Sequence, residues 1–427
     1  MITMLSCSTL GDINTELLQL PAYSPPTILP SYSPDPATGE ERLDHTPRTR
    51  THPTGTYIKQ CGRDSVALSD QDVGASVPVY GRHASISGFV SLEDRETVSE
   101  ILLKIKGKME VMISESGSLA TTLVHDSYTL WSSHKPSTST STCPSAVPFS
   151  VSLPTDFRDS DGLPHRLPPT YEVPCAAAPG MFFKTSYILS VTITRTVSKR
   201  LRFLSTSKTI PIRFIYAPRT HPWRPIQHSS DFLLDVKRMP EEFRQSVTPL
   251  LPRPHISTAL PMDLQLFLPT VEIFGLDDII PFHVQLTGRV SALREFIPLD
   301  DTPTLTPPIV GSLIRQITVE INDRTATRQL VIGHAKMSPR PPGPDAHEHE
   351  EEAEVSLDWD GEVRCKTDTM VAGFDAGCIR IQDFILIELR PHHASTRSEY
   401  VTLRHSHPIK LVTESWVDYS LTRNDPR

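Results

Sequence analysis

From residue 101 to residue 113 the chain follows a hydrophobic period of two. The odd positions are apolar or glycine, namely Ile101, Leu103, Ile105, Gly107, Met109, Val111 and Ile113. The even positions include Lys104, Lys106, Lys108 and Glu110. Because successive side chains of a strand point to opposite faces, this period predicts a strand with one buried and one solvated face.

The same period recurs along the chain. In the first half it predicts strands at residues 77–80, 85–92, 98–113, 119–131, 146–153, 184–197 and 208–216. In the second half it predicts strands at residues 264–268, 282–288, 313–321, 329–337, 355–365, 379–389 and 401–411. No helical crossover of a dozen residues separates them, so the sheets should be antiparallel. The predicted fold class is all-β, with two tandem antiparallel β-sandwich domains of immunoglobulin-like type.

Changes in composition divide the chain into five segments. Residues 1–72 are rich in Pro, Ser, Thr and Asp and are predicted to be a disordered tail. The sandwiches are predicted at residues 73–218 and 263–416, with a connector at 219–262 and a C-terminal tail at 417–427. Within the connector, apolar residues from Phe232 to Met239 have helical spacing, Ser230 or Asp231 is the expected N-cap, and Pro240 ends the helix.

Composition narrows the functional classes. The chain has 427 residues, enough for two domains, with 40 prolines and a net charge of −8. The acidic total gives no reason to expect nucleic acid as the main partner. The six cysteines show no zinc-type spacing, which favours reduced thiols. The N-terminus lacks the pattern of a secretory signal, and no apolar run approaches the ~20 residues of a membrane span. We expect a cytoplasmic protein that reaches membranes only through its partners.

An ordered series of segments resembles the arrestins. It runs from Pro78–Gly81 through Ile86–Gly88 and Lys106–Gly107 to residues 148–154, the LPPTY segment at Leu167–Tyr171, and residues 187–195. Residues 263–288 resemble the opening of an arrestin C-terminal domain. The likeness spans residues 73–416 and is greatest to the arrestin-like (α-arrestin) proteins of fungi. It implies two arrestin-like sandwiches that act as an adaptor in protein transport.

The LPPTY segment contains the P-P-x-Y sequence of Pro168, Pro169 and Tyr171. Such a segment in polyproline II conformation suits the aromatic groove of a WW domain. In α-arrestins such motifs recruit HECT-type ubiquitin ligases. The alternative is structural, because arrestin-like domains carry an LPPSF-like segment at this place as part of the fold. Exposure of the segment distinguishes the two interpretations.

A short repeat in the N-terminal tail provides a second candidate for WW binding. The sequence L-P-x-Y-S-P occurs twice, and its candidate contact residues are Leu20, Pro21, Tyr23, Leu29, Pro30 and Tyr32. Two tethered weak sites raise apparent affinity through effective concentration. The alternative is a proline-rich linker without a partner.

Basic residues give a third candidate site, at a predicted turn and the strand after it. They are Lys199, Arg200, Arg202, Lys208 and Arg213. Receptor-binding arrestins use basic surfaces for phosphorylated tails, and charge-assisted hydrogen bonds to phosphate would serve that purpose here. The row of Lys104, Lys106 and Lys108 could add to it or form an ordinary solvated sheet face.

The remaining motifs favour no catalytic chemistry. The loop with His347, His349 and several glutamates is expected to be solubilising, and His405 and His407 to be satisfied, half-buried residues. No G-x-S-x-G, H-E-x-x-H, G-x-G-x-x-G or P-loop sequence occurs. We therefore expect a non-enzymatic adaptor without cofactors that connects cytoplasmic tails of membrane proteins to a WW-domain HECT ligase for ubiquitination and endocytosis. The alternatives are a ubiquitin-independent trafficking scaffold like the arrestin-shaped subunit of retromer, and a β-sandwich hydrolase or carbohydrate-binding module.

Overall fold

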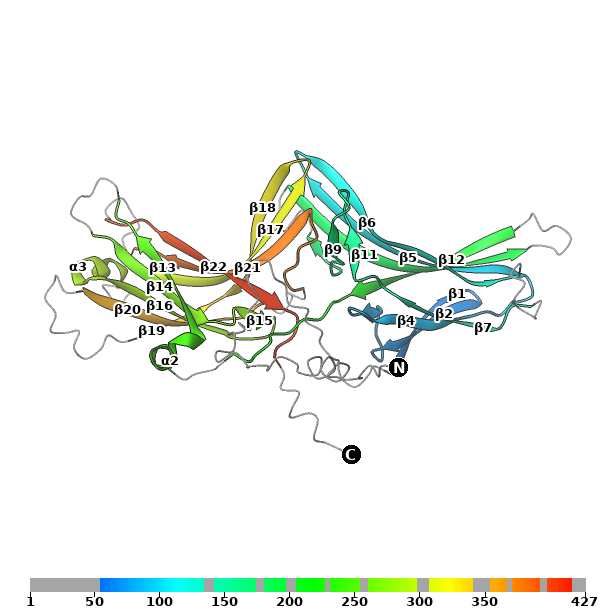
Figure 1. The fold of residues 1–427 in the computed structure, drawn as a ribbon, viewed down its shortest axis with the longest axis horizontal. Helices are drawn as coiled ribbons and strands as arrows, with labels where there is room; N and C mark the ends of the chain where they lie inside the picture. The colour runs from blue at the N-terminus through cyan, green and yellow to red at the C-terminus, as the bar shows by residue number, and fades with distance from the viewer. Residues whose placement is uncertain are drawn as a thin grey trace, which may run out of the picture. The chain divides into compact units, whose positions relative to one another are not determined.

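A computed structural model describes residues 54–133, 142–173, 180–196, 205–226, 231–253, 260–297, 307–340, 354–366, 371–391 and 398–416. These residues are almost entirely β-structure, and the prediction of tandem sandwiches is confirmed (Figure 1). The described α-helices are short, α2 (Phe232–Arg238) and α3 (Val290–Leu293), each followed by a 3₁₀ turn, η1 (Pro240–Glu242) and η2 (Arg294–Phe296). No described helix has the length and apolar character that crossing a bilayer requires.

The first sandwich pairs a four-stranded sheet with a six-stranded one. The four-stranded sheet has the order β1 (Gly55–Cys61), β2 (Asp64–Gln71), β4 (Ser85–Ser91) and β7 (Ala146–Ser152). The other has the order β3 (Val79–Tyr80), β12 (Ser205–Tyr216), β11 (Met181–Thr196), β5 (Val98–Ile113) and β6 (Gly117–Ser132), and β10 (Glu172–Val173) also pairs with β11. A separate hairpin consists of β8 (Asp156–Arg158) and β9 (Pro164–Arg166).

The second sandwich repeats this strand order. One sheet runs β13 (Phe243–Leu250), β14 (Met262–Pro269), β16 (Ile280–Arg289), β20 (Glu354–Val363) and β19 (Lys336–Arg340). The other runs β15 (Ile273–Gly275), β22 (Leu403–Val412), β21 (Ile379–Leu389), β17 (Ile309–Ile321) and β18 (Arg324–His334). Thus β13-β14-β16-β20 matches β1-β2-β4-β7, and β15-β22-β21-β17-β18 matches β3-β12-β11-β5-β6.

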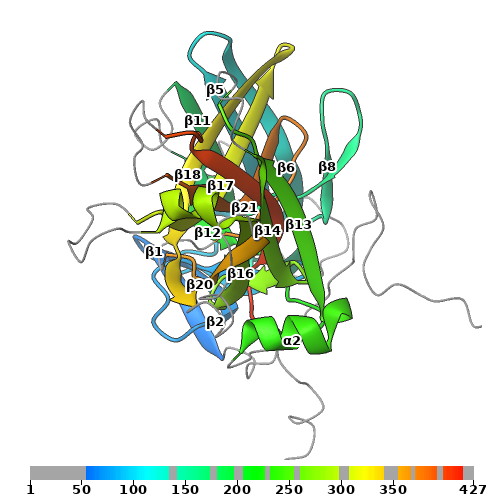
Figure 2. The ribbon, with the colours of Figure 1, turned by 90° about the vertical axis from the view of Figure 1, so that its left-hand side faces the viewer.

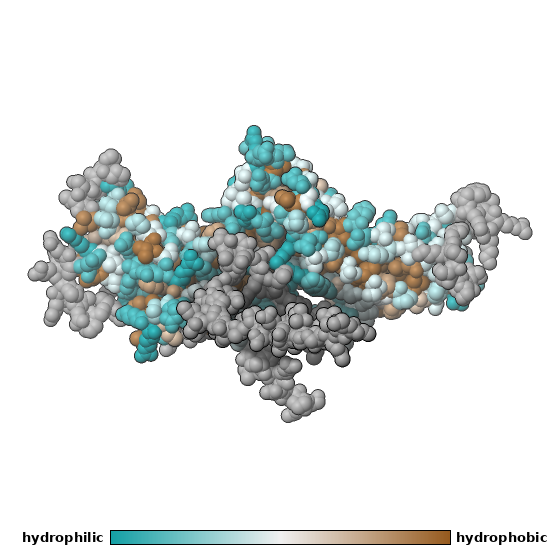
Figure 3. Space-filling view, viewed as in Figure 1, coloured by the Kyte–Doolittle hydropathy of each residue, from teal (hydrophilic) through white to brown (hydrophobic). Residues whose placement is uncertain are grey.

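The alternation in β5 decides which face is core. Ile101, Leu103 and Ile105 are 0% exposed, whereas Lys106 and Lys108 are exposed. Figure 3 shows hydrophobic and hydrophilic residues interspersed over one face of the molecule. Scattered apolar residues of this kind are normal for a folded surface.

Three predicted boundaries differ from the structure. The tail prediction for residues 1–72 is wrong for its last part, because β1 and β2 lie there and β2 pairs with β4. The edge strand β1 is mostly exposed, so it has no clear alternation. The predicted connector contains β13, which pairs with β14, and the predicted strand 329–337 is two strands in different sheets, β18 and β19. Residues 1–53 and 417–427 lie outside the described part of the chain.

Two other predictions have clear outcomes. Helix α2 has Asp231 as its N-cap, with the carboxylate accepting from the Leu234 amide at 3.1 Å, and it ends before Pro240, as predicted. Almost all strand pairs are antiparallel, but β3 pairs with β12 and β15 with β22 in parallel. These short strands run along the far edge of their sheets because the chain crosses from the opposite sheet to reach them.

The two sandwiches share an apolar joint. Ile317, Val319 and Ile381 of β17 and β21 belong to the same buried cluster as β5 and β11. A buried ion pair lies beside it, with Arg315 Nε 2.8 Å from Asp383 Oδ1 and the second guanidinium nitrogen 3.1 Å from Oδ2. Arg315 also hydrogen-bonds the side chain of Tyr171 from the first sandwich. Both ions of the pair are at most 2% exposed, and among the described residues neither has another ion-pair partner.

We predict that Arg315→Met lowers the free energy of unfolding by about 3–5 kcal/mol, because it leaves the buried carboxylate of Asp383 without a positive partner. The double variant Arg315→Met/Asp383→Leu should recover most of the loss, since neither charge then remains. Urea denaturation followed by circular dichroism measures both. The control is Arg380→Met, which removes an exposed Arg–Asp pair of the same 2.8 Å length and should cost less than about 1 kcal/mol. A double variant as unstable as the single one would contradict the assignment.

His405 connects the two sheets at one edge of the second sandwich. Its Nδ1 lies 2.7 Å from Thr248 Oγ1 of β13 and its Nε2 lies 3.4 Å from Ser246 Oγ. The neighbouring His407 is 2.7 Å from Glu272. Burial, with a smaller contribution from His407, lowers the pKa of His405 below its usual 6.5. The expectation of satisfied, half-buried histidines is confirmed.

A pH dependence follows from His405. Its pKa is lower in the folded chain, so the unfolded chain binds more protons below pH 6.5. Stability should therefore fall as the pH drops from neutral through 6.5 to the folded pKa, and His405→Asn should flatten this dependence. The measurement is the urea midpoint as a function of pH, with His125→Asn, an exposed histidine, as the control. An equal pH slope in the wild type and His405→Asn would rule out this origin.

Candidate functional site

The P-P-x-Y segment is built into the first sandwich. Pro168 and Pro169 are buried, and their carbonyl oxygens accept hydrogen bonds from Tyr187 Oη and Thr185 Oγ1, each at 2.5 Å. The Thr170 amide donates to the Tyr216 carbonyl at 2.9 Å. The prolines are therefore held against β11 and β12 rather than presented to solvent.

Tyr171 completes this segment at the joint between the sandwiches. Its ring centroid is 6.2 Å from that of Phe183 and 6.2 Å from that of Phe374, the latter edge-on at 88°. To bind such a segment, a WW domain must take up the proline side chains and the tyrosine ring of the ligand in the groove on its surface. The folded chain thus does not offer Pro168, Pro169 and Tyr171 as a ligand, and of the two sequence interpretations the contacts support the structural one.

The basic turn divides into residues with different roles. Lys199, Arg200 and Arg202 lie outside the described residues. Lys208 donates to the Cys61 carbonyl and lies 3.6 Å from Asp64, a carboxylate that is 2% exposed and that Arg195 also contacts at 2.6 Å. Lys208 therefore holds the β1–β2 turn against β11 and β12, which contradicts its predicted role in phosphate binding. Arg213 is exposed, as that role requires.

Arg213 belongs to a cationic surface that the register of the sheet assembles. His125 of β6 pairs with Lys106 of β5, Lys106 with Ile188 of β11, and Ile188 with Arg213 of β12. Neighbouring strands are about 4.8 Å apart, and residues i and i+2 of one strand are about 7 Å apart. The Cα atoms of Lys104, Lys106 and Arg213 therefore lie within about 12 Å of one another. We call Lys104, Lys106, His125 and Arg213 the basic face.

The lysines of this sheet differ in their described ion-pair partners. Lys108 pairs with Glu110 at 2.6 Å and Lys184 with Glu172 at 2.5 Å. By contrast, no carboxylate in the described part of the chain lies within 4.0 Å of Lys104, Lys106 or Arg213. Hydroxyl groups of Thr192 and Thr209 follow along the same face. Cations beside hydroxyl donors suit carboxylates or phosphates.

The tail motifs with Leu20, Pro21, Tyr23, Leu29, Pro30 and Tyr32 lie outside the described residues, as do His347 and His349. In the described ranges, no group of three or more His, Cys, Asp or Glu side chains is arranged to hold a metal. Burial raises the pKa of the Cys143 thiol to about 11 and that of Cys365 to about 12. Both thiols are therefore protonated at neutral pH and lack the thiolate that nucleophilic chemistry needs.

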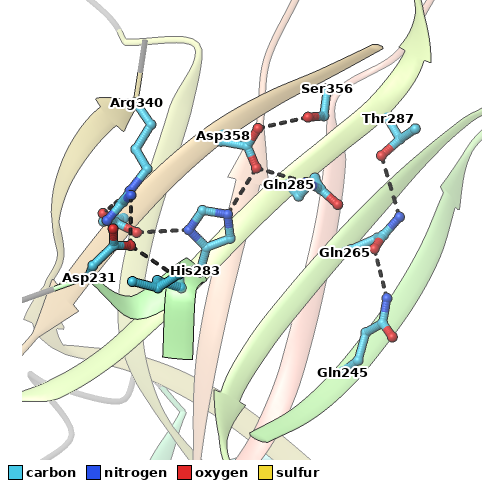
Figure 4. Close-up of polar contacts among 11 residues, drawn as sticks. Asp231, Gln245, Gln265, His283, Gln285, Thr287, Arg340, Ser356 and Asp358 are labelled. Carbon is cyan, nitrogen blue, oxygen red and sulfur yellow. Dashed lines mark hydrogen bonds and ion pairs between the residues drawn. The ribbon is translucent and has the colours of Figure 1, made fainter. Parts of the chain in front are cut away.

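Sequence reasoning missed a polar cluster on the outer face of the second sandwich (Figure 4). His283 of β16 is 0% exposed, with Nδ1 2.8 Å from Asp360 and Nε2 3.0 Å from Asp358. The imidazole ring therefore bridges the two carboxylates. Arg340 of β19 contacts Asp360 and also reaches Asp231, the N-cap of α2, at 2.9 Å.

The cluster fastens α2 to the sheet. Phe232 of α2 stacks on His283 with a centroid distance of 6.4 Å, and Figure 2 shows α2 beside the sheet of β14, β16 and β20. Burial alone would raise the pKa of Asp358, but hydrogen bonds from His283, Ser356 and Gln285 outweigh it and lower the pKa. Because His283 has no solvent contact, the arrangement stabilises the fold and offers no access to a substrate. The pairing of β20 with β16 and with β19 brings these residues together, so the linear sequence contains no direct signal of the cluster.

Comparison with known proteins adds no relative: no protein-family model and no curated protein matches the chain.

We predict that His283→Gln lowers the free energy of unfolding by about 3 kcal/mol, because two partly buried carboxylates lose the ring that both contact. Amides of residues 231–239 should also exchange hydrogen faster, because α2 loses the ring beneath Phe232. Urea denaturation and hydrogen-exchange mass spectrometry measure the two effects. The matched control is His334→Gln on an exposed position of β18. Unchanged exchange in α2 would show that the cluster does not hold the helix.

Proposed function

We propose that this chain is a non-catalytic, arrestin-like adaptor. It links cytoplasmic tails of membrane proteins to a WW-domain HECT ubiquitin ligase and so promotes ubiquitination and endocytosis of the bound cargo. It acts in the cytoplasm and is recruited to the plasma membrane or endosomes by its partners. Its mechanism is proximity, which needs no bond-making residue in this chain.

The basic face is the observation that carries the proposal. It displays three cations without described carboxylate partners on one solvated sheet. Acidic or phosphorylated tails supply the complementary charge, and exposed complementary charges speed association and select partners. The repeated strand order of the two sandwiches supports the arrestin-like part, since the sequence resemblance also runs through two successive domains.

The ligase arm of the proposal rests on the tail repeats. Because Pro168 and Pro169 are buried, docking falls to the motifs around Tyr23 and Tyr32. A single L-P-x-Y motif lacks one proline of the P-P-x-Y sequence, so each is a weak ligand. Two of them nine residues apart engage tandem WW domains more tightly through effective concentration.

A second candidate keeps the platform and drops ubiquitin. Burial of the P-P-x-Y segment favours it, because the strongest ligase motif of the sequence is then unavailable. Such a chain acts as a ubiquitin-independent trafficking scaffold and binds coat proteins through the same surfaces. Mass spectrometry of co-purified proteins separates the two, with a ligase expected in the first case and a sorting complex in the second.

We predict that the Tyr23→Ala/Tyr32→Ala double variant loses at least tenfold in binding to the WW domains of a HECT ligase, whereas each single variant retains part of it. The measurement is a pull-down of the full chain with immobilised tandem WW domains. Tyr171→Phe keeps the ring at the joint and serves as the control that should bind like the wild type. Undiminished binding of the double variant would eliminate the ligase arm and leave the scaffold candidate.

A further inference from the structure

Strand β6 is a long, free sheet edge. It has 16 residues, and the only described strand that it pairs with is β5. Strands in globular proteins average about 5–6 residues. The side of β6 that faces away from β5 therefore presents an extended row of backbone donors and acceptors, which is a template for an added strand.

The other long edge strands carry the protections that natural edges usually have. Proline, lysine or arginine occurs in each, namely Lys59 in β1, Pro148 in β7, Arg244 and Pro249 in β13, Arg324 and Arg328 in β18, and Lys336 and Pro339 in β19. The edge strands β3 and β15 have two and three residues. Strand β6 has no proline, lysine or arginine, and Asp126 is its one carboxylate. Unlike the other long edge strands that are described, β6 exposes its backbone N–H and C=O groups without a proline, lysine or arginine that would discourage pairing with another strand.

The two β-bulges of β6 define where a partner strand fits. The register with β5 shifts at Ile101/Leu102 and at Gly107/Lys108. Between these shifts, residues 124–128 of β6 pair regularly with residues 103–107 of β5. Bulges interrupt a ladder and twist the strand, so the straight, accessible stretch is centred on residues 124–128.

The two faces beside this edge differ in chemistry. On the core side of this stretch, Tyr128 lies opposite the buried Leu103 and is 36% exposed, and Asp126 lies opposite the buried Ile105. On the solvent side, His125 and Ser127 lie opposite Lys106 and Lys104 of the basic face. An added strand thus meets the ring of Tyr128, with Asp126 beside it, through one set of alternate side chains and the side of the basic face through the other.

We propose that β6 binds an extended segment of a partner protein as an additional strand, and that this segment alternates apolar and acidic residues. An apolar side chain covers the ring of Tyr128 at the rim of the core. The acidic side chains lie beside His125, one strand away from Lys104 and Lys106. Backbone hydrogen bonds supply affinity and the alternating side chains supply specificity. The inference does not depend on ligase recruitment through the tail.

A second copy of this chain is the competing occupant. Antiparallel pairing of two β6 strands over the whole of residues 124–128 would place Asp126 opposite Asp126. Like charges directly opposite each other destabilise a strand pair. The charge pattern therefore favours a foreign acidic segment over self-association.

The test uses a fluorescein-labelled seven-residue peptide that alternates valine and glutamate, and the same peptide with lysine in place of glutamate. Fluorescence anisotropy with the full chain gives Kd, and hydrogen-exchange mass spectrometry locates the contact. We expect the glutamate peptide to bind at least tenfold more tightly and to slow exchange in residues 117–132. Two further peptides carry N-methyl groups on alternate residues, so that each has one backbone edge blocked. Their Kd values should differ, because only one of them loses the amides that pair with β6.

Variants of the chain complete the test. Lys106→Glu should shift the preference toward the lysine peptide, and Tyr128→Lys should weaken binding about tenfold by placing a charge at the core side of the edge. Val331→Lys, an apolar position that is 44% exposed on the protected edge β18, should leave Kd unchanged. Equal affinity for both peptides, or protection outside β6, would overturn the proposal. Concentration-dependent dimers with β6 protected in the absence of peptide would assign the edge to a second copy instead. The peptide comparison on the wild type decides the matter even if a variant fails to fold.

Discussion

The ladder between β5 and β11 is the interaction on which the rest of the molecule depends. Both strands have 16 residues, and they pair from Met181 with Ile113 to Arg195 with Val98 with a single irregularity near one end. A one-residue slip would turn every buried isoleucine of β5 outward, since the side-chain period is two. The same ladder fixes where the lysines of β5 lie, where β6 forms the sheet edge, and which residues meet the second sandwich.

Polar pairs inside the fold contribute specificity more than stability. Arg315 with Asp383, His283 with two aspartates, and Asp64 with Arg195 each remove charges from water, which costs several kcal/mol per ion before the attraction repays it. Each pair also connects elements that are distant in sequence. A misplaced joint, helix or hairpin would leave one of these charges alone, so the pairs discriminate against alternative packings.

The sequence predicted what depends on alternation and missed what depends on pairing. The faces of β5, β11 and β17 follow directly from their apolar positions, because a half-buried strand must alternate. Strand β1 escaped notice because an edge strand buries few side chains, and β13 because prolines surround it. The repeated strand order shows afterwards that β1-β2 and β13-β14 are equivalent hairpins. His283 and its aspartates, like the availability of Pro168 and Pro169, depend on contacts between segments that no local pattern encodes.

The position of Tyr171 has a consequence for covalent regulation. Its side chain is hydrogen-bonded to Arg315, which is 1% exposed, and its half-buried ring packs against Phe183 and Phe374. A tyrosine kinase must draw several residues around its target into an extended conformation within its own active-site cleft. Here that requires the segment to leave β11 and β12 and Tyr171 to leave Arg315, so phosphorylation of Tyr171 would compete with the contact between the two sandwiches.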